Sequence, residues 1–421
     1  MSVVEPFNPT QAPLLDVLSS ASFLRDLEIH WSLFTPDCDE RLTAIIPELS
    51  HLRRLRLFTP VNTRKLVTPV VYKLRTQLHT FEVCCPNEAS YVNEDLPPDL
   101  GAYQTHLRVL HIAYPDLINI SWVPFPTVHT LQLLWPTDLP ISLRHIAQTF
   151  PSLRQLAISV GVHVWGGDPR LARARDDALT FQRFGGGWRS LDALVASTIP
   201  EAWMLGLVCP VAYVRLGVYD SMFHEGFVDV IHGARPKTVS FALRCIGGCE
   251  HPEGEQPLFI FPTDAGPGPG AITHAVMFLL MQPVHEWGAS SVDQGTSEII
   301  RMIESHIRHS RLEYLHVVIG AEYVFSRERF ADPEWEIYER VLKPSIVVLH
   351  VFRQAFQDID VEALVSALAA AGEHLRVIVL TITIRGQSVW TIDRGKTGKV
   401  TDSVDARKII EREERAYSYQ M

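Results

Sequence analysis

Three residues that could bind a metal ion lie close together in the segment CIGGCEH: Cys245, Cys249 and His251. Thiolate and imidazole groups are preferred zinc ligands, but a structural zinc site takes four of them, often from two paired cysteine clusters. No second cluster of this kind occurs in the sequence. We therefore expect reduced cysteines in a loop here, and no structural metal.

The segment DRGKTGKV, residues 393–400, raises the possibility of a phosphate-binding loop. The motif GxxxxGK[ST] needs a glycine five residues before Gly395, where its backbone amides help to form a cradle for phosphate. That position is Trp390. The glycine cluster of RFGGGW also lacks the GxGxxG spacing of a dinucleotide site. We expect no nucleotide or other cofactor.

A third group, Glu304, His306 and His309, lies in a segment with helical periodicity. Helical zinc proteases place their histidines at positions i and i+4. His306 and His309 are three residues apart, so solvated helix residues are the better interpretation. Spacing identifies no nucleophile with a base and an orienting acid. The sequence thus predicts no catalytic residue, and we expect a protein that is not an enzyme.

A short apolar sequence pattern recurs along the chain around these residues. The pattern φxxφxφ, with φ apolar, recurs in SHLRRLRLF, THLRVLHIA and PSLRQLAIS. Thirteen candidate copies span 351 residues (24 to 375) in twelve steps, a mean spacing of about 29. The clear copies begin at Leu24, Leu52, Leu78, Leu107, Val128, Leu153, Val211, Leu312, Ile346 and Leu375, and the weaker ones at Leu191, Pro236 and His274. This period and pattern are typical of leucine-rich repeats.

Each copy predicts a strand in which the last two apolar positions share the buried face. A parallel neighbour requires a long connection, usually a helix. The segments SLRHIAQTF, DVEALVSALAAAG, DERLTAIIP and SEIIRMIESHIRHS have helical apolar spacing. We therefore predict an α/β leucine-rich-repeat solenoid, with a curved parallel sheet on the concave side and helices on the convex side. Leu55, Leu110, Leu156 and Leu315 should be buried core positions.

The predicted organisation has three parts. Residues 1–23 form an N-terminal capping segment and residues 24–384 an irregular solenoid, with insertions near 162–190 and 245–272 that are rich in glycine or proline. Residues 385–421 form a C-terminal cap or tail with a last amphipathic stretch, DARKIIEREERAYS. Long insertions in a repeat array are usually functional or disordered.

Composition narrows the class of protein. The chain has 421 residues, of which 47% are hydrophobic, enough for a large core, and a formal net charge of −10. This charge argues against nucleic acid as a partner. No apolar run approaches the length of a membrane span, and no secretory signal stands at the start. The six cysteines have no disulfide-framework spacing. We therefore expect an intracellular protein, cytoplasmic or nuclear, without a membrane partner.

The run LLDVLSSASFLRDLEIHWSLFTPDCDERLTAIIPELSHLRRLRLFTPV, together with TFPSLRQLAIS, resembles the leucine-rich-repeat portion of F-box proteins from mushroom-forming fungi. The resemblance covers most of residues 14–385. In that family an N-terminal F-box module docks the adaptor of a cullin ubiquitin ligase. No phrase of the F-box type precedes the first repeat at Leu24.

These observations predict that the protein is a protein-protein interaction scaffold, which binds a partner of unknown identity on its concave face. The alternative implied by the resemblance is a substrate-recognition subunit of a cullin ubiquitin ligase, and an enzyme with a pocket built by the insertions is a third possibility. Alternation along the strands places Phe278, Tyr314 and Phe352 in an exposed aromatic row, the predicted partner anchors. Arg54 and Arg56 are the second choice.

Overall fold

A computed structural model describes most of the repeat region. The described residues are 12–30, 36–58, 70, 73–74, 76–84, 100, 103–113, 124–135, 142–160, 169–219, 221–246, 272–282, 301, 303–304, 307–308, 310–321, 359–382, 386–393, 396–400 and 403–414. The chain divides into two compact units, residues 1–191 (unit 1) and residues 192–421 (unit 2).

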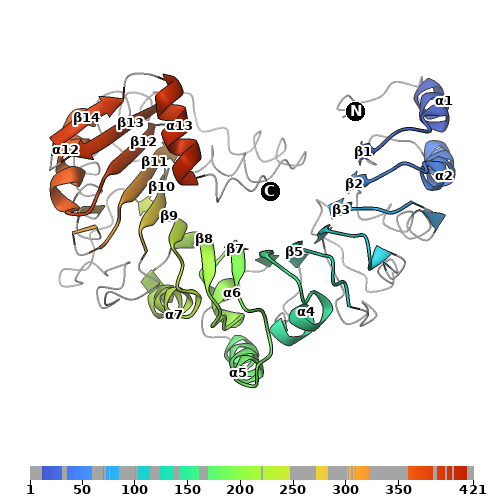
Figure 1. Cartoon of the computed structure of the whole chain (residues 1–421), viewed down its shortest axis with the longest axis horizontal. Coiled ribbons are helices and arrows are strands. Elements are labelled where there is room, and N and C mark those ends of the chain that lie inside the picture. The colour runs from blue at the N-terminus through green and yellow to red at the C-terminus, as the bar shows by residue number, and fades with distance from the viewer. Residues whose placement is uncertain are drawn as a thin grey trace. The chain divides into compact units, whose positions relative to one another are not determined.

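Unit 1 alternates strands with helices. Its elements are α1 (Ala12–Ser20), β1 (Asp26–His30), α2 (Pro36–Ile45), the 3-10 helix η2 (Ile46–Glu48), β2 (Arg54–Phe58), β3 (Thr80–Cys84), β4 (Val109–Ala113), β5 (Thr130–Trp135), α4 (Leu143–Thr149), β6 (Gln155–Val160) and α5 (Pro169–Arg183). The strands pair in sequence order, all in parallel. The helices lie on one side of the strands (Figure 1).

Unit 2 begins inside β7 (Leu191–Ala196). Its further elements are α6 (Ile199–Met204), β8 (Val211–Tyr219), the 3-10 helix η5 (Ser221–Phe223), α7 (His224–Ala234), β9 (Thr238–Ile246), β10 (His274–Gln282), β11 (Tyr314–Ala321), α12 (Val361–Ala371), β12 (Val377–Ile382), β13 (Gly386–Asp393), β14 (Lys396–Val400) and α13 (Ser403–Glu414). Strands β8 to β12 are parallel, whereas β13 and β14 are antiparallel. The described part of the chain is thus an α/β fold, mostly parallel, with 14 strands and eight α-helices.

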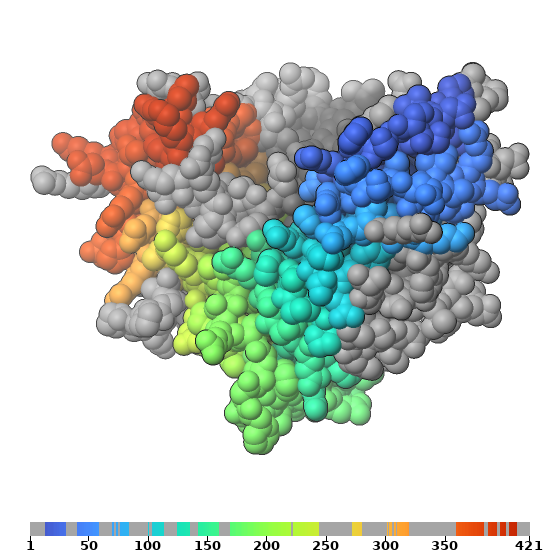
Figure 2. Space-filling view, turned by 45° about the vertical axis from the view of Figure 1, so that its right-hand side comes forward, coloured from blue at the N-terminus to red at the C-terminus, as the bar shows by residue number. Residues whose placement is uncertain are grey.

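The predicted repeats coincide with the strands. Six copies in unit 1 are each followed, two residues later, by the first residue of a strand, β1 to β6. Equivalent repeat positions also pair across the sheet: Leu55 lies opposite Leu27 in β1 and Phe81 in β3. Figure 2 shows the same order at the surface, where the colours of unit 1 run in sequence from blue through cyan to green. The repeat at Ile346 lies outside the described residues.

One weak copy has a different start from the predicted one. His274 pairs with Thr238 and Tyr314, both of which stand two residues after the first apolar position of their repeats. The repeat of β10 therefore begins at Ile272 rather than at His274. Because side chains alternate with a period of two, this shift leaves each residue of β10 on the face that we predicted.

The core follows the apolar positions of the repeats. Leu55, Leu110, Leu156 and Leu315 are buried, as the alternation predicts. They point to the side that carries the connecting helices in each unit, so that stacked repeats bury one another's apolar residues. Truncation of such a leucine to alanine costs about 2–5 kcal/mol of stability.

The helix boundaries follow capping residues that the sequence shows. Ser142 precedes α4 and its hydroxyl oxygen accepts a hydrogen bond from the backbone N–H of His145 at 3.4 Å. Asp360 precedes α12, where its carboxylate accepts from the N–H of Ala363 at 3.0 Å. Such caps satisfy donors that the first turn of a helix leaves unpaired. Gly372 directly follows α12.

The glycine-rich segment 162–190 is not wholly an irregular insertion. It contains α5, the 15-residue helix that follows β6. The glycine cluster ends this helix: Gly185 and Gly187 have φ angles of 81° and 89°, a backbone conformation that favours glycine. The region is therefore largely an ordinary helical connection. Of the other predicted insertion, 245–272, residues 247–271 lie outside the described part.

The C-terminal segment is more structured than the predicted cap or tail. A hairpin, β13 and β14, extends the sheet antiparallel to β12, and α13 follows it. Helices α12 and α13 lie on opposite sides of these strands (Figure 1). The segment DRGK, considered above as part of a phosphate loop, connects the two strands of the hairpin, so residues 396–400 form a strand rather than a phosphate cradle.

Candidate functional site

The face of unit 1 opposite its helices carries a row of charged side chains. The row consists of His30 and Glu28 in β1, Arg56 in β2, Glu82 in β3 and His111 in β4. Glu28, Arg56, Glu82 and His111 occupy the same register position in four adjacent parallel strands. Neighbouring strands are about 4.8 Å apart, which brings these side chains within reach of one another. We refer to these five residues as the charged row.

Acidic and basic groups alternate along the charged row. The Nε2 atom of His30 lies 3.3 Å from Oε1 of Glu28, and Nη1 of Arg56 lies 3.4 Å from Oε2 of the same carboxylate. On its other side, Nε of Arg56 is 2.7 Å from Oε2 of Glu82. Nδ1 of His111 is 3.5 Å from that oxygen. Arg56 thus joins two carboxylates, and each carboxylate has a histidine on its far side.

Burial differs along the charged row. The side chains of Glu28, His30 and Arg56 are 27%, 30% and 35% exposed, whereas those of Glu82 and His111 are 8% and 15% exposed. The ring of His30 also stacks on Phe58, with 4.3 Å between centroids and an interplanar angle of 5°. The β1–β2 end of the row is therefore accessible to a partner, while the β3–β4 end is held inside the sheet face.

Electrostatic interactions keep the buried carboxylate ionised. Burial alone would raise the pKa of Glu82, but the hydrogen bond and charge of His111 and the charge of Arg56 outweigh burial and hold that pKa below its ordinary value. Burial lowers the pKa of Arg56, and the two glutamates reverse this effect and raise it. The charges are fixed in place by one another, which gives the face a defined pattern of donors and acceptors.

The chemistry of the charged row favours recognition over catalysis. A histidine oriented by a carboxylate is part of many hydrolase sites, but such a site also needs a nucleophile within hydrogen-bond reach of the histidine. Among the residues that the structure describes, no serine, threonine or cysteine side chain forms a hydrogen bond with His30 or His111. The row can donate and accept hydrogen bonds and pair with charges on another molecule.

Of the predicted anchors, Arg56 is central to the charged row, and Arg54 is an exposed residue of the same strand. Alternation along β1 places Glu28 and His30 on this face, and they lie there. Glu82 also lies on that side, but it is buried between Arg56 and His111. His111 was not singled out. It stands four residues after Leu107, at the same repeat position as Glu82, so alternation alone places it on this face.

The prediction that Tyr314 is an exposed anchor is wrong. Tyr314 is only 1% exposed and belongs to an apolar cluster with Val377, Val379 and Val389. The partly buried residues Val400, Ala406, Ile409 and Ile410, from β14 and α13, pack against this cluster. The C-terminal segment thus covers the face on which Tyr314 lies, which makes this tyrosine a core residue.

The other two aromatic anchors have different outcomes. Phe278 in β10 is half-buried, and the guanidinium of Arg215 lies 5.9 Å from the centre of its ring. It does not lie beside Tyr314, because the register pairs Phe278 with Val318. Phe352 lies outside the described residues. The structure therefore does not bring the three predicted aromatic anchors together as one exposed row.

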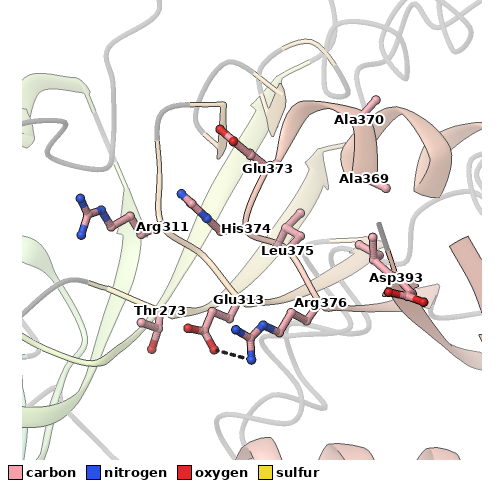
Figure 3. A pocket seen from close by; sticks show the side chains of 12 residues that line it. Thr273, Arg311, Glu313, Ala369, Ala370, Glu373, His374, Leu375, Arg376 and Asp393 are labelled. Atoms are coloured by element: carbon pink, nitrogen blue, oxygen red, sulfur yellow. Dashed lines mark ion pairs between the residues drawn. The ribbon is translucent and has the colours of Figure 1, made fainter. Parts of the chain in front are cut away.

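Unit 2 also contains a pocket of about 1170 Å³ at the edge where β10, β11 and β12 begin (Figure 3). Its charged lining residues are Arg311, Glu313, Glu373, His374, Arg376 and Asp393. Nη1 of Arg376 is 3.9 Å from Oε2 of Glu313, and both side chains are well exposed, so water screens the pair. No titratable side chain in the described lining is buried. The charged side chains of this pocket therefore stand at its solvent-exposed surface.

Within the described residues, no group of three or more histidine, cysteine, aspartate or glutamate side chains is arranged to hold a metal ion. The candidate ligands Cys249 and His251 lie outside these residues, as do His306 and His309. The described free cysteine, Cys209, is buried, and burial raises the pKa of its thiol to about 11. A thiol with this pKa is not a reactive nucleophile at neutral pH.

No protein-family model matches the chain, and a search of curated proteins also finds no match. Among the helices that the structure describes, none combines the length and the apolar character that crossing a membrane requires.

Proposed function

We propose that this protein is a non-enzymatic, leucine-rich-repeat scaffold that binds a protein partner on the outward face of unit 1. The charged row supports this proposal more than any other observation. Packing of the sheet face opposite the helices does not require charged side chains. Here five side chains on that face form an ordered, partly accessible network of ion pairs. Arginine is enriched among residues that anchor partners at interfaces.

The partner contacts Glu28, His30 and Arg56, the accessible part of the charged row. Glu82 and His111 position Arg56 from the buried side. Because Glu82 holds the guanidinium at 2.7 Å, Arg56 loses little further side-chain freedom on binding. Pre-ordered side chains lower the entropic cost of association. The row therefore gives orientation and specificity, and the surrounding face gives contact area.

Site-directed photocrosslinking tests this proposal. A photoreactive phenylalanine analogue at Gln132, the half-buried neighbour of His111 in the register, should capture a defined protein in the native cell. The same analogue at Val17, an exposed residue of α1, serves as the control on the helical side. Capture of the same protein from both positions, or from Val17 alone, would contradict an interface on the sheet face.

The captured protein then allows a quantitative test. Glu28→Gln removes one half of the Arg56 pairing but leaves Glu82 in place, so the fold should persist. We expect at least a tenfold loss of affinity for the captured protein. Arg41→Gln is the matched control, since Arg41 pairs with Asp16 between α2 and α1 at 2.6 Å. Equal affinities of the two variants would reject the charged row as the binding site.

The resemblance to F-box proteins offers a second proposal, a substrate receptor of a cullin ubiquitin ligase. It rests on the repeat residues quoted above. Co-precipitation decides between the two: the cullin adaptor together with the photocaptured partner supports the receptor, and the partner without the adaptor supports the scaffold.

A further inference from the structure

A row of basic residues marks the edge of unit 1 where the strands begin. The residue immediately before each of the strands β1 to β6 is an arginine or a histidine. These residues are Arg25, Arg53, His79, Arg108, His129 and Arg154, which we call the basic edge. Backbone hydrogen bonds join them in order, from the N–H of each to the carbonyl of the one before, over 2.7–2.9 Å. The six positions therefore form one continuous line.

The basic edge is open to solvent. Arg25, Arg108, His129 and Arg154 are exposed, while Arg53 and His79 are half-buried. Among the described residues, no carboxylate forms an ion pair with Arg25, Arg53 or Arg108. The positive charges of Arg53 and Arg108 act on His79, whose pKa is lowered by burial and by these charges. Arg53 and Arg108 thus lie on either side of His79, and an anionic ligand would be attracted to both guanidinium groups.

The repeat architecture does not require a basic residue at this position. In unit 2 the residues that directly precede β9, β10, β11 and β12 are Lys237, Thr273, Glu313 and Arg376. They continue the same backbone pattern. The N–H groups of Thr273, Glu313 and Arg376 donate hydrogen bonds to the carbonyl oxygens of Lys237, Thr273 and Glu313, respectively. The edge geometry therefore accepts a neutral or an acidic side chain, so it does not by itself require the arginine or histidine that stands before every strand from β1 to β6.

An exposed aromatic ring accompanies the basic edge. Phe23, two residues before Arg25, is 80% exposed and stacks on His51, two residues before Arg53, with 5.3 Å between ring centroids. A large exposed apolar side chain next to arginines is typical of an interface anchor. The surface thus combines positive charge with one apolar contact at the β1–β2 end.

We propose that the basic edge binds an extended acidic peptide segment of a protein partner, with an apolar side chain of that segment on Phe23. The row covers five strand steps of about 4.8 Å, or about 24 Å, which an extended peptide of about seven residues spans. Carboxylates and arginine form charge-assisted, often bidentate hydrogen bonds. This surface is separate from the charged row, so either can be disrupted without the other.

A peptide fits this surface better than a nucleic acid. Proteins that bind single strands offer successive aromatic platforms for the bases, and the described part of the basic edge has one such platform, the Phe23–His51 pair. The net charge of −10 over the whole chain also repels a long polyanion, whereas a short acidic segment meets chiefly the local positive field.

The test uses the full chain and a fluorescein-labelled peptide of nine glutamates and one leucine, followed by fluorescence anisotropy at low salt. The double variant Arg25→Gln/Arg108→Gln should bind it at least tenfold more weakly than the unmodified protein. The matched control, Arg41→Gln/Arg173→Gln, removes the same charge from exposed positions on α2 and α5 and should stay within twofold. Circular dichroism of both variants should match that of the unmodified protein.

The outcomes separate the possible explanations. Equal losses in the two double variants would overturn the proposal, because they would show a response to net charge alone. Absence of peptide binding by the unmodified protein would also overturn it. A single-stranded oligonucleotide of ten residues that binds more tightly than the peptide, with the same loss in Arg25→Gln/Arg108→Gln, would replace the peptide by a nucleic acid. Phe23→Ser should weaken binding of the leucine-containing peptide and leave binding of deca-glutamate unchanged.

Discussion

Glu82 in unit 1 and Val379 in unit 2 occupy the same position of the repeat, four residues after its first apolar residue, and both side chains are buried. Glu82 is covered by the side chains of its own face, Arg56 and His111. Val379 is covered by elements that follow it in the chain, β13 and α13. The repeat pattern therefore does not predict whether the side chain at an outward position is exposed or buried. What lies over the sheet decides whether such a position becomes a binding surface or a core.

The largest expected difference in stability is between aromatic substitutions on this face of the sheet in unit 1 and in unit 2. Tyr314→Ser should lower the free energy of unfolding by about 3–5 kcal/mol, since it leaves a cavity beneath α13. Phe58→Ser should cost only about 1–2 kcal/mol, because Phe58 is half-buried and loses mainly its stacking on His30. Urea denaturation measures both. Similar costs for the two substitutions would show that the faces are equally part of the core.

On this face of unit 1, ion pairs stand in place of apolar contacts. Removal of one member of a pair should therefore lower the free energy of unfolding. Arg56→Met should destabilise the protein by about 1–3 kcal/mol, because Glu82 is left buried beside a side chain that cannot pair with it. The matched control, Arg54→Met in the same strand, is exposed and should change stability by less than about 0.5 kcal/mol.

A double substitution sharpens this prediction. Arg56→Met with Glu82→Leu removes both charges and should recover most of the stability, because buried ion pairs are often replaceable by apolar residues. Thermal denaturation of the three variants gives the comparison. A double variant less stable than Arg56→Met alone would show that Glu82 has a further structural role.

Much of the fold could be predicted from the sequence because the repeat pattern is local. The strand starts, the helix caps at Ser142 and Asp360 and the buried leucines all depend on residues within one repeat. The hairpin and the packing of α13 depend on contacts with other strands, and no local spacing expresses them. Tyr314 was misjudged for this reason.

The candidate site could be predicted only in part. Alternation placed Glu28, His30 and Arg56 on one face, and it would also have placed His111 there. The parallel register that brings Arg56 between two carboxylates is a property of neighbouring strands. The basic edge was visible as a recurrent arginine after the first apolar residue, but its continuity required the pairing of six strands.

The apolar cover in unit 2 should be separable from the sheet beneath it. Ile409→Ser with Ile410→Ser should weaken the packing of α13 and cost about 1–2 kcal/mol, since both residues are only partly buried. Hydrogen exchange should rise in β12 and β13 and stay unchanged in β1 to β4. Arg407→Ser, an exposed position of the same helix, is the control. Faster exchange in unit 1 would contradict a local role for this cover.

The smallest expected effect is the response of unit 1 to acid. The pKa of Glu82 is lowered in the folded protein from an ordinary value of 4.5, so its charged form stabilises the fold at neutral pH. This contribution is complete above the unfolded-state pKa and is lost as the pH falls through the lower, folded-state pKa. The stability difference between the unmodified protein and Glu82→Gln should therefore shrink steadily as the pH is lowered from 7 to below 4.5. Glu40→Gln, at an exposed position of α2, should give a difference near zero that does not follow this course. Denaturation with urea at a series of pH values measures both curves, and a difference for Glu82→Gln that grows in acid would show that Glu82 is bound in its neutral form.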